Sequence, residues 1–148
     1  MDDRRDPPVE LSFEECRELL DTQSVGRVAF VGPDGVRILP VNSTLRDGAV
    51  EFRTTSYSEL ATHAPGTWIA FEVDELDPVH RSGWSVIVTG DCERVVEESG
   101  STHTPPVPSG AEPWAGGRRA LVLRLELHQV TGRRVGGGEW EHPHAHRD

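Results

Sequence analysis

The chain has 148 residues, a length that fits one domain with its own hydrophobic core. Its formal net charge of -10 argues against a general nucleic-acid binder and against attachment to anionic membranes. The two cysteines, Cys16 and Cys92, have the spacing of neither a disulfide framework nor a zinc site. The first ten residues lack the apolar segment of a signal peptide, and no apolar run is long enough to span a membrane. We therefore expect a cytoplasmic protein with reduced thiols.

The first predicted element is a helix that follows a charged, flexible arm over residues 1–10. Ser12 and Glu15 have the spacing of a capping box, in which each side chain bonds the backbone N–H of the other residue. Apolar side chains at helical spacing then define one face: Phe13, Cys16, Leu19 and Leu20. We expect this helix to pack that face against the rest of the domain.

Six segments have the β-branched and aromatic composition of strands: residues 25–31, 36–45, 49–54, 67–73, 83–97 and 120–130. Asp47-Gly48 is typical of a two-residue hairpin turn between the second and third strands. Pro40 has no N–H, which predicts an unpaired edge or a bulge, and Gly90 predicts a bulge or bend. A second capping-box pattern, Ser56 with Glu59, predicts a short helix between the third and fourth strands.

Short connections between strands favour antiparallel pairing, and a long antiparallel sheet removes its exposed edges by closing. The predicted fold is therefore mostly β, a small antiparallel barrel with a few helices. We expect the ordered domain over residues 11–135, followed by a flexible Gly/His-rich tail over residues 136–148. A polar connection is predicted over residues 74–82 and a flexible Ser/Pro-rich loop over residues 99–113.

Two segments have side chains that could bind a metal ion. The tail contains His142, His144 and His146. The predicted connection after the fourth strand contains Asp74, Glu75 and Asp77. In both cases a solvated polar segment is the simpler interpretation, and we predict no metal site.

The order of the segments resembles a known family. In chain order they read VGRVAFV, RILPVN, DGAVEFRT, SEL, IAFEVDELD, GWSVIVTG, PWA and LHQVTGRRV. From about residue 12 to residue 135 this set is similar to the pyridoxamine 5′-phosphate oxidase-like family of FMN-binding split barrels, in its small actinobacterial-type form. The resemblance implies a six-stranded antiparallel split β-barrel, with an N-terminal helix and a short helix between strands three and four. It also implies a homodimer with the flavin sites at the interface.

The resemblance further assigns residues to the cofactor. Those that would run along the isoalloxazine ring are Arg37, Ile38, Leu39, Pro40, Val41 and Asn42. Because Pro40 lacks an N–H, the amides of Leu39 and Val41 would meet the polar edge of the ring. Those that would reach the FMN phosphate are Arg53, Thr54, Thr55 and Ser58. Those that would close the site from the partner subunit are Trp84 and Ser85.

Each of these residues also has a plain structural interpretation. Without the resemblance, Arg53 is a solvated charge on a strand. The hydroxyls near Ser58 are ordinary turn and cap groups. Trp84 and Trp114 are core or dimer-interface residues.

One position departs from the family pattern. Many relatives have a Lys or Arg directly after the helix-start serine, where it pairs with the phosphate, and this chain has Glu59. A carboxylate repels a phosphate dianion. The alternatives are FMN held by Arg53 and hydroxyls, a cation such as Arg81 recruited from elsewhere, the deazaflavin F420, or no cofactor. Glu59 could also point back to cap Ser56.

The resemblance implies a flavin (FMN)-dependent oxidoreductase acting on a small-molecule substrate, in which the cofactor carries the hydride chemistry. No side chain stands out as an acid or base, so the catalytic residues are unknown. Arg133 and Arg134 match the substrate-binding residues of the vitamin B6 oxidase poorly, so vitamin B6 synthesis is not predicted. The alternative is a non-catalytic module that holds a flavin, deazaflavin or haem.

Overall fold

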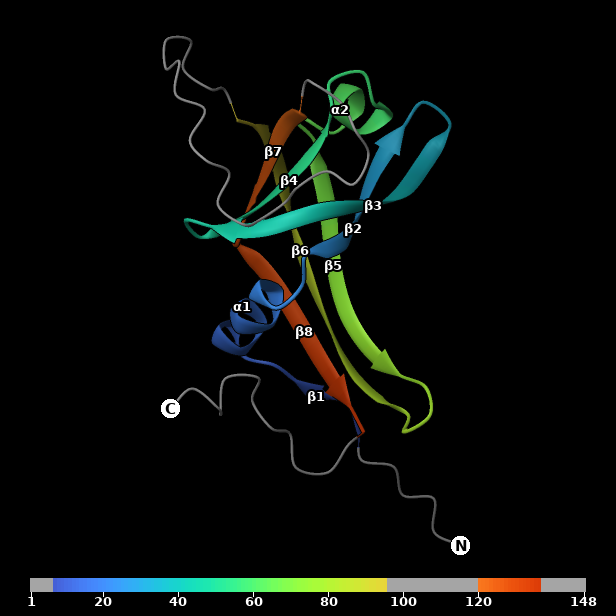
Figure 1. Cartoon of the computed structure of the whole chain (residues 1–148), viewed down its shortest axis with the longest axis vertical. Helices are drawn as coiled ribbons and strands as arrows, with labels where there is room; N and C mark the ends of the chain where they lie inside the picture. The colour runs from blue at the N-terminus through green and yellow to red at the C-terminus, as the bar shows by residue number, and fades with distance from the viewer. Residues whose placement is uncertain (1–6, 96–119, 137–148) are drawn as a thin grey trace, which may run out of the picture.

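The computed structural model describes residues 7–95 and 120–136. Two helices, α1 (Phe13–Asp21) and α2 (Glu59–His63), accompany the strands. The strands are β1 (Val9–Glu10), β2 (Val25–Gly32), β3 (Gly35–Arg46), β4 (Ala49–Thr55), β5 (Trp68–Asp77), β6 (Ser82–Arg94), β7 (Ala120–Glu126) and β8 (Gln129–Val135). Figure 1 shows long strands β5 and β6 running the length of the molecule, with α2 at one end and β1 at the other. Within the described ranges, no helix has the length and apolar character needed to cross a membrane.

Six strands close into an antiparallel barrel, as predicted. Their order is β6–β5–β2–β3–β4–β7, and β7 completes the ring because it pairs with both β4 and β6. The long strand β6 changes partner along its length: residues 83–89 pair with β8 and residues 92–94 with β7. Gly90 lies at this change, where a Cβ would come within 3.2 Å of Leu125. The Asp47-Gly48 turn also forms as predicted, with positive φ angles of 49° and 73°.

The predicted single strand over residues 120–130 is wrong, because the chain breaks after Glu126 and resumes as β8. Strands β7 and β8 are both antiparallel to β6, so the chain does not reverse between them. Up to Glu126 the chain is bound to β4 and curves with the barrel, whereas β8 has no pairing with β4 and continues alongside β6. Strand β1 then pairs with β8, which extends the sheet beyond the barrel.

Helix α1 begins at the predicted capping box. The Glu15 N–H donates to Ser12 Oγ and the Ser12 N–H donates to Glu15 Oε1, both at 3.2 Å. Its buried face consists of Cys16, Leu19 and Leu20, and it packs against Gly132 of β8. Phe13 is not part of that face, because its side chain is 48% exposed.

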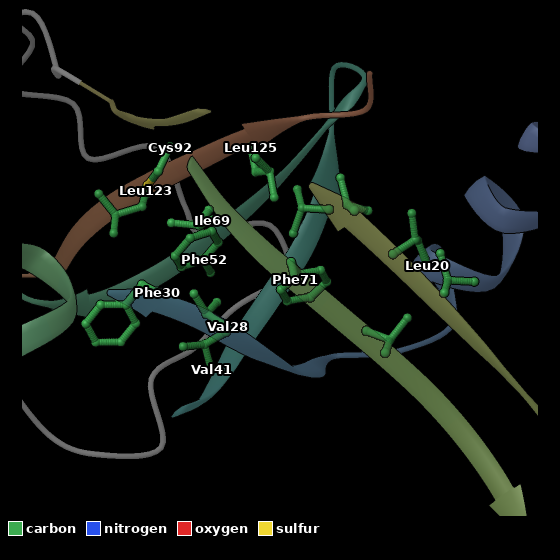
Figure 2. Packing of buried hydrophobic residues seen from close by; sticks show 14 of the residues in the cluster. Leu20, Val28, Phe30, Val41, Phe52, Ile69, Phe71, Cys92, Leu123 and Leu125 are labelled. Carbon is green, nitrogen blue, oxygen red and sulfur yellow. The ribbon is translucent and has the colours of Figure 1, made fainter. Parts of the chain in front are cut away.

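The hydrophobic core fills the interior of the barrel (Figure 2). The rings of Phe52 and Phe71 stack across it, with centroids 6.3 Å apart. Phe30, from the end of β2, is buried in the same cluster near the start of α2. Each such ring stabilises the fold by roughly 1.5–3 kcal/mol through burial alone. The polar strand ends around α2 therefore lie directly on a packed hydrophobic core.

Candidate cofactor-binding site

The candidate site is the split between β3 and β4, which diverge beyond their shared hairpin (Figure 1). The two strands pair only through residues 43–46 and 49–52. Among the described residues, the remainder of β3 pairs with β2 alone and the remainder of β4 with β7 alone. Each strand thus presents an unpaired backbone edge to the split. Unpaired edge N–H and C=O groups are available to a ligand.

The hydrogen-bond register of β3 decides which of its backbone groups face the split. The Ser43 N–H donates to the Ser24 carbonyl, beside β2, at 2.9 Å. Antiparallel ladders alternate residue by residue, so residues 37, 39 and 41 also bond to β2, and residues 36, 38 and 40 face the split. The missing N–H of Pro40 therefore removes no hydrogen bond from the β2–β3 ladder, which confirms the predicted place of Pro40 at an unpaired edge.

The predicted role of the Leu39 and Val41 amides is wrong for the same reason. Both amides belong to the ladder with β2, and the Val41 side chain is buried in the core. The N–H groups that face the split are those of Val36 and Ile38, and Pro40 adds its carbonyl. The polar edge of a flat ring bound along this strand would meet the N–H of Ile38 and not those of Leu39 and Val41.

Hydroxyl groups meet where β4 passes into α2. Thr54 Oγ1 and Ser58 Oγ lie 2.6 Å apart in a partly buried contact. Ser58 is also the N-cap of α2, since its Oγ accepts the Ala61 N–H at 3.0 Å. The predicted cap at Ser56 is therefore wrong by two residues. Helix α2 has only five residues, so hydroxyls and charged side chains, rather than a helix dipole, determine what this corner can bind.

An ion pair between Arg37 and Glu59 links β3 to α2 at the same corner. Arg37 Nε lies 3.3 Å from Glu59 Oε2, and both side chains are partly exposed. Gly32 makes room for the pair, because a Cβ there would lie 3.2 Å from both Arg37 Cγ and Glu59 Oε1. Glu59 therefore bonds Arg37 and does not return to Ser56. This contact joins residues 22 positions apart, so no local pattern predicts it.

The remaining predicted phosphate ligands are Arg53 and Thr55 on β4. Both are half-buried, and both point to the opposite face of the strand from Thr54. Within residues 7–95 and 120–136, the Arg53 guanidinium has no ion-pair partner. Arg81, the other cation considered, lies in the β5–β6 turn at the far end of the molecule from α2 (Figure 1). Arg37, which pairs with Glu59, is instead the cation at this corner.

Trp84 and Ser85 lie on β6, which is separated from β3 by two strands, β5 and β2. The Trp84 side chain is 4% exposed and belongs to the hydrophobic core, so it offers no free ring surface. Ser85 lines an open cavity of about 540 Å³ with Glu10, Ile87, Thr131 and Arg133. A single chain does not bring this cavity and the split together. Their joint use of one ligand requires two subunits.

An acidic pair on the outer face of the sheet was missed at the sequence level. Arg27 Nη1 lies 3.6 Å from Glu72 Oε2 and 3.5 Å from Asp74 Oδ2, while Glu72 Oε1 is buried without a partner. Burial, a hydrogen bond that the protonated Glu72 donates to Asp74, and the negative charge of Asp74 raise the pKa of Glu72 to about 7, against the opposing effect of Arg27. Asp74 was predicted in a polar connection, but β5 continues to Asp77.

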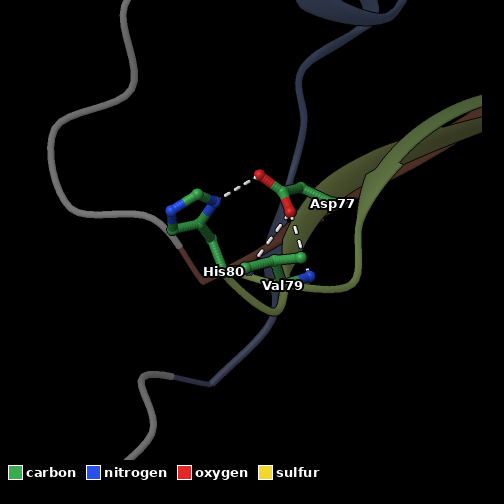
Figure 3. Close-up of polar contacts among 3 residues, drawn as sticks. All are labelled: Asp77, Val79 and His80. Carbon is green, nitrogen blue, oxygen red and sulfur yellow. Dashed lines mark hydrogen bonds and ion pairs between the residues drawn. The ribbon is translucent and has the colours of Figure 1, made fainter.

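The third acidic residue of that predicted connection, Asp77, organises a turn (Figure 3). Its Oδ1 accepts the N–H groups of Val79 and His80, at 3.0 and 3.1 Å, and its Oδ2 contacts the His80 ring. These hydrogen bonds from His80 and Val79 lower the pKa of Asp77. Asp74 and Asp77 are thus committed to separate partners, Arg27 and His80. Trp114, the loop over residues 99–113 and the histidines of the tail lie outside the described residues.

Comparison with known proteins identifies relatives across almost the whole described chain. The sequence pattern of the pyridoxamine 5′-phosphate oxidase family matches residues 12–134. The uncharacterized protein Rv0080 of Mycobacterium tuberculosis is 34% identical over 138 residues, which cover 86% of this chain and 85% of the relative.

Solved structures give the same result. The FAD binding protein from Mycobacterium smegmatis is 28% identical, with a TM-score of 0.66 over 86% of this chain and 98% of its own. A conserved protein of unknown function from Corynebacterium diphtheriae, DIP1874, is also 28% identical, with a TM-score of 0.69 over 88% of this chain and 99% of its own. With the split between β3 and β4, these matches show that the chain belongs to the pyridoxamine 5′-phosphate oxidase-like family of FMN/FAD-binding split barrels.

Proposed function

We propose that the protein binds a flavin in the split between β3 and β4 and uses it as a homodimeric oxidoreductase acting on a small molecule. The observation that carries the proposal is the junction of three features in one place: the free edge of β3, the Thr54–Ser58 hydroxyl pair and the Arg37–Glu59 ion pair. The edge supplies peptide groups at the spacing of a strand, and the corner beyond it supplies hydroxyl donors and a cation.

The donor set fits a phosphorylated flavin. Hydroxyl and guanidinium groups are the usual ligands of phosphate oxygens. Arg37 contributes one positive charge to the corner and Glu59 one negative charge, so the ion pair carries no net charge, while Arg53 lies on the other face of β4. Thr54 and Ser58 can each donate an O–H to an oxygen that replaces the other hydroxyl as acceptor. The phosphate therefore needs no rearrangement of the backbone.

A bound flavin would supply the hydride and electron chemistry, and this chain would bind it, orient it and limit its exposure to water. The Ile38 N–H and the Pro40 carbonyl face the position of the ring, so they would fix its orientation. Ile38 is 66% exposed, and its side chain would cover apolar ring surface. The Glu59 carboxylate, which contacts β3 at this corner, is held by Arg37, so we assign no catalytic acid or base.

The dimer is part of the same proposal. Apolar side chains are exposed on the outer face of the sheet. Val31, Val36, Ile38 and Trp68 lie near one another, and Ile87 lies farther along the same face, beside Glu72. A second copy would cover this face and bring the cavity beside Ser85 to the split of its partner. We further place the protein in the cytoplasm, because Cys16 and Cys92 are free and buried, and burial raises the pKa of the Cys92 thiol to about 12.

The first test is the absorption spectrum of the full-length protein after purification and after incubation with flavin. A flavin spectrum that remains after gel filtration, together with bleaching by dithionite and recovery in air, is the expected result. A protein that binds neither riboflavin nor its phosphorylated forms would overturn the proposal. A Soret band would identify haem instead, and a flavin that neither NADH nor NADPH nor a partner reductase can reduce would favour the non-catalytic alternative.

The sequence predicts FMN, and the M. smegmatis relative is described as an FAD binding protein. The two flavins differ in the charge on the phosphate that would enter the corner. The charges of the corner therefore bear directly on which flavin is bound.

A further inference from the structure

We propose that Glu59, held by Arg37, makes the phosphate corner selective for a singly charged phosphate ester over the doubly charged terminal phosphate of FMN. The inference rests on the proposed function, since it concerns the flavin site. It gives Glu59 a defined role as a specificity residue. The corresponding ligand is a flavin whose phosphate is esterified on both sides, as in the pyrophosphate of a dinucleotide.

The charges of the corner carry the argument. Arg37 is always protonated, so it contributes one positive charge. Glu59 Oε2 lies 3.3 Å from Arg37 Nε and consumes part of the charge that Arg37 would offer a ligand. A phosphate monoester carries a charge of about -1.5 to -2 at pH 7, whereas a diester phosphate carries -1 because it has no second proton to lose. Because the Arg37–Glu59 pair has no net charge, the second negative charge of a monoester is repelled by Glu59 without a further cation to offset it, so the corner favours the diester.

The position of Glu59 is held by the start of α2 and by contacts of its side chain. It is the first residue of α2, directly after Ser58, whose Oγ caps the helix and contacts Thr54. Gly32 lets the ion pair lie directly against the β2–β3 hairpin, and a larger residue there would contact both partners. The carboxylate is thus held next to the hydroxyls that would bind the phosphate. It cannot move away without losing its bond to Arg37.

The test compares flavins that differ only in phosphate charge. Cofactor-free full-length protein is titrated with riboflavin, FMN and the monomethyl ester of FMN, and the quenching of flavin fluorescence gives each Kd; FAD is titrated in parallel. For the wild type we expect the methyl ester to bind at least fivefold more tightly than FMN. Glu59→Gln should tighten FMN at least fivefold, change riboflavin less than twofold, and so abolish the preference for the ester.

Two further variants make the result specific. Glu14→Gln removes the same charge from α1, away from α2, and should leave the ratio between ester and FMN unchanged. Arg37→Gln should weaken both phosphorylated flavins at least fivefold with little effect on riboflavin. The inference is overturned if Glu59→Gln shifts all the flavins equally, or if the wild type binds FMN as tightly as its ester. Failure of the wild type to bind any flavin would instead refute the proposed function, and the inference with it.

Discussion

Two carboxylates, those of Glu59 and Glu72, make contacts that the local sequence does not predict. Glu59 is the first residue of α2 and has the spacing of a capping residue, yet its carboxylate bonds Arg37 of β3. Glu72 alternates correctly for an outward-facing strand residue, yet one of its oxygens is buried without a partner. Both contacts depend on strand neighbours distant in sequence, which pattern and propensity do not specify. The contact between Thr54 and Ser58 is local by contrast, because it joins residues four positions apart, and their role at a phosphate stays a prediction.

The raised pKa of Glu72 predicts a pH-dependent stability. Its folded-state pKa of about 7 exceeds the ordinary value of 4.5, so the folded state holds its proton where the unfolded state has lost it. This contribution is complete below pH 4.5, falls as the pH rises toward 7, and is lost above that value. We expect Glu72→Gln to raise the free energy of unfolding at pH 8, relative to wild type, by about 1 kcal/mol after allowance for partial exposure.

The measurement is urea unfolding of both proteins at pH 5 and pH 8. The two stabilities should be close at pH 5 and should separate at pH 8. Asp74→Asn serves as the companion variant, because removal of its charge takes away one cause of the raised pKa and should flatten the pH dependence in part. A difference that is the same at both pH values would refute a protonated Glu72.

Among the helices, strands and turns, the sequence predicted the features that depend only on residues close together in the chain. The Ser12–Glu15 capping box and the Asp47-Gly48 turn both form, because each depends on residues no more than four apart. The break between β7 and β8 was not predictable in this way. It arises where the chain leaves its partner β4 and continues between β6 and β1. Helix α2 was predicted, but two serines offered equivalent caps and only one lies next to Thr54.

The position of that cap is testable. Ser58→Ala removes the acceptor of the Ala61 N–H and the partner of Thr54, so it should lower the free energy of unfolding by about 1 kcal/mol. Ser56→Ala is the matched control, since Ser56 is exposed and outside the helix, and it should change stability by less than about 0.5 kcal/mol. Equal effects of the two substitutions, measured by thermal or urea unfolding, would mean that the cap is shared.

For the whole molecule, the predicted barrel is correct, while its extension by β1 and β8 was not foreseen. The proposed dimer determines whether the split and the cavity beside Ser85 can act on one ligand. Ile87 is 41% exposed on the outer face, next to Glu72 in the strand register. We expect Ile87→Glu to raise the dimer dissociation constant at least tenfold, because it places an unpaired carboxylate within an apolar interface.

Light scattering coupled to gel filtration measures this effect. Val79→Glu, in the exposed β5–β6 turn, is the control and should leave the mass unchanged. If the cavity belongs to the site, Ile87→Glu should also weaken flavin binding as the dimer dissociates. A wild-type protein that is monomeric at tens of micromolar would refute the dimer, and a dimeric Ile87→Glu variant would place the interface on another face.

The pairing of β1 with β8 also affects how quickly the fold can form. Val9 lies opposite Arg134, and α1 rests on Gly132, so the first and last described elements must meet before the sheet is complete. Closing so long a loop lowers the folding rate, because chain entropy is lost before the contact stabilises anything. The barrel strands have nearer partners and can associate earlier. During synthesis, α1 can contact β3 and β6 early, but the part of its apolar face that packs on β8 stays uncovered until β8 has been made.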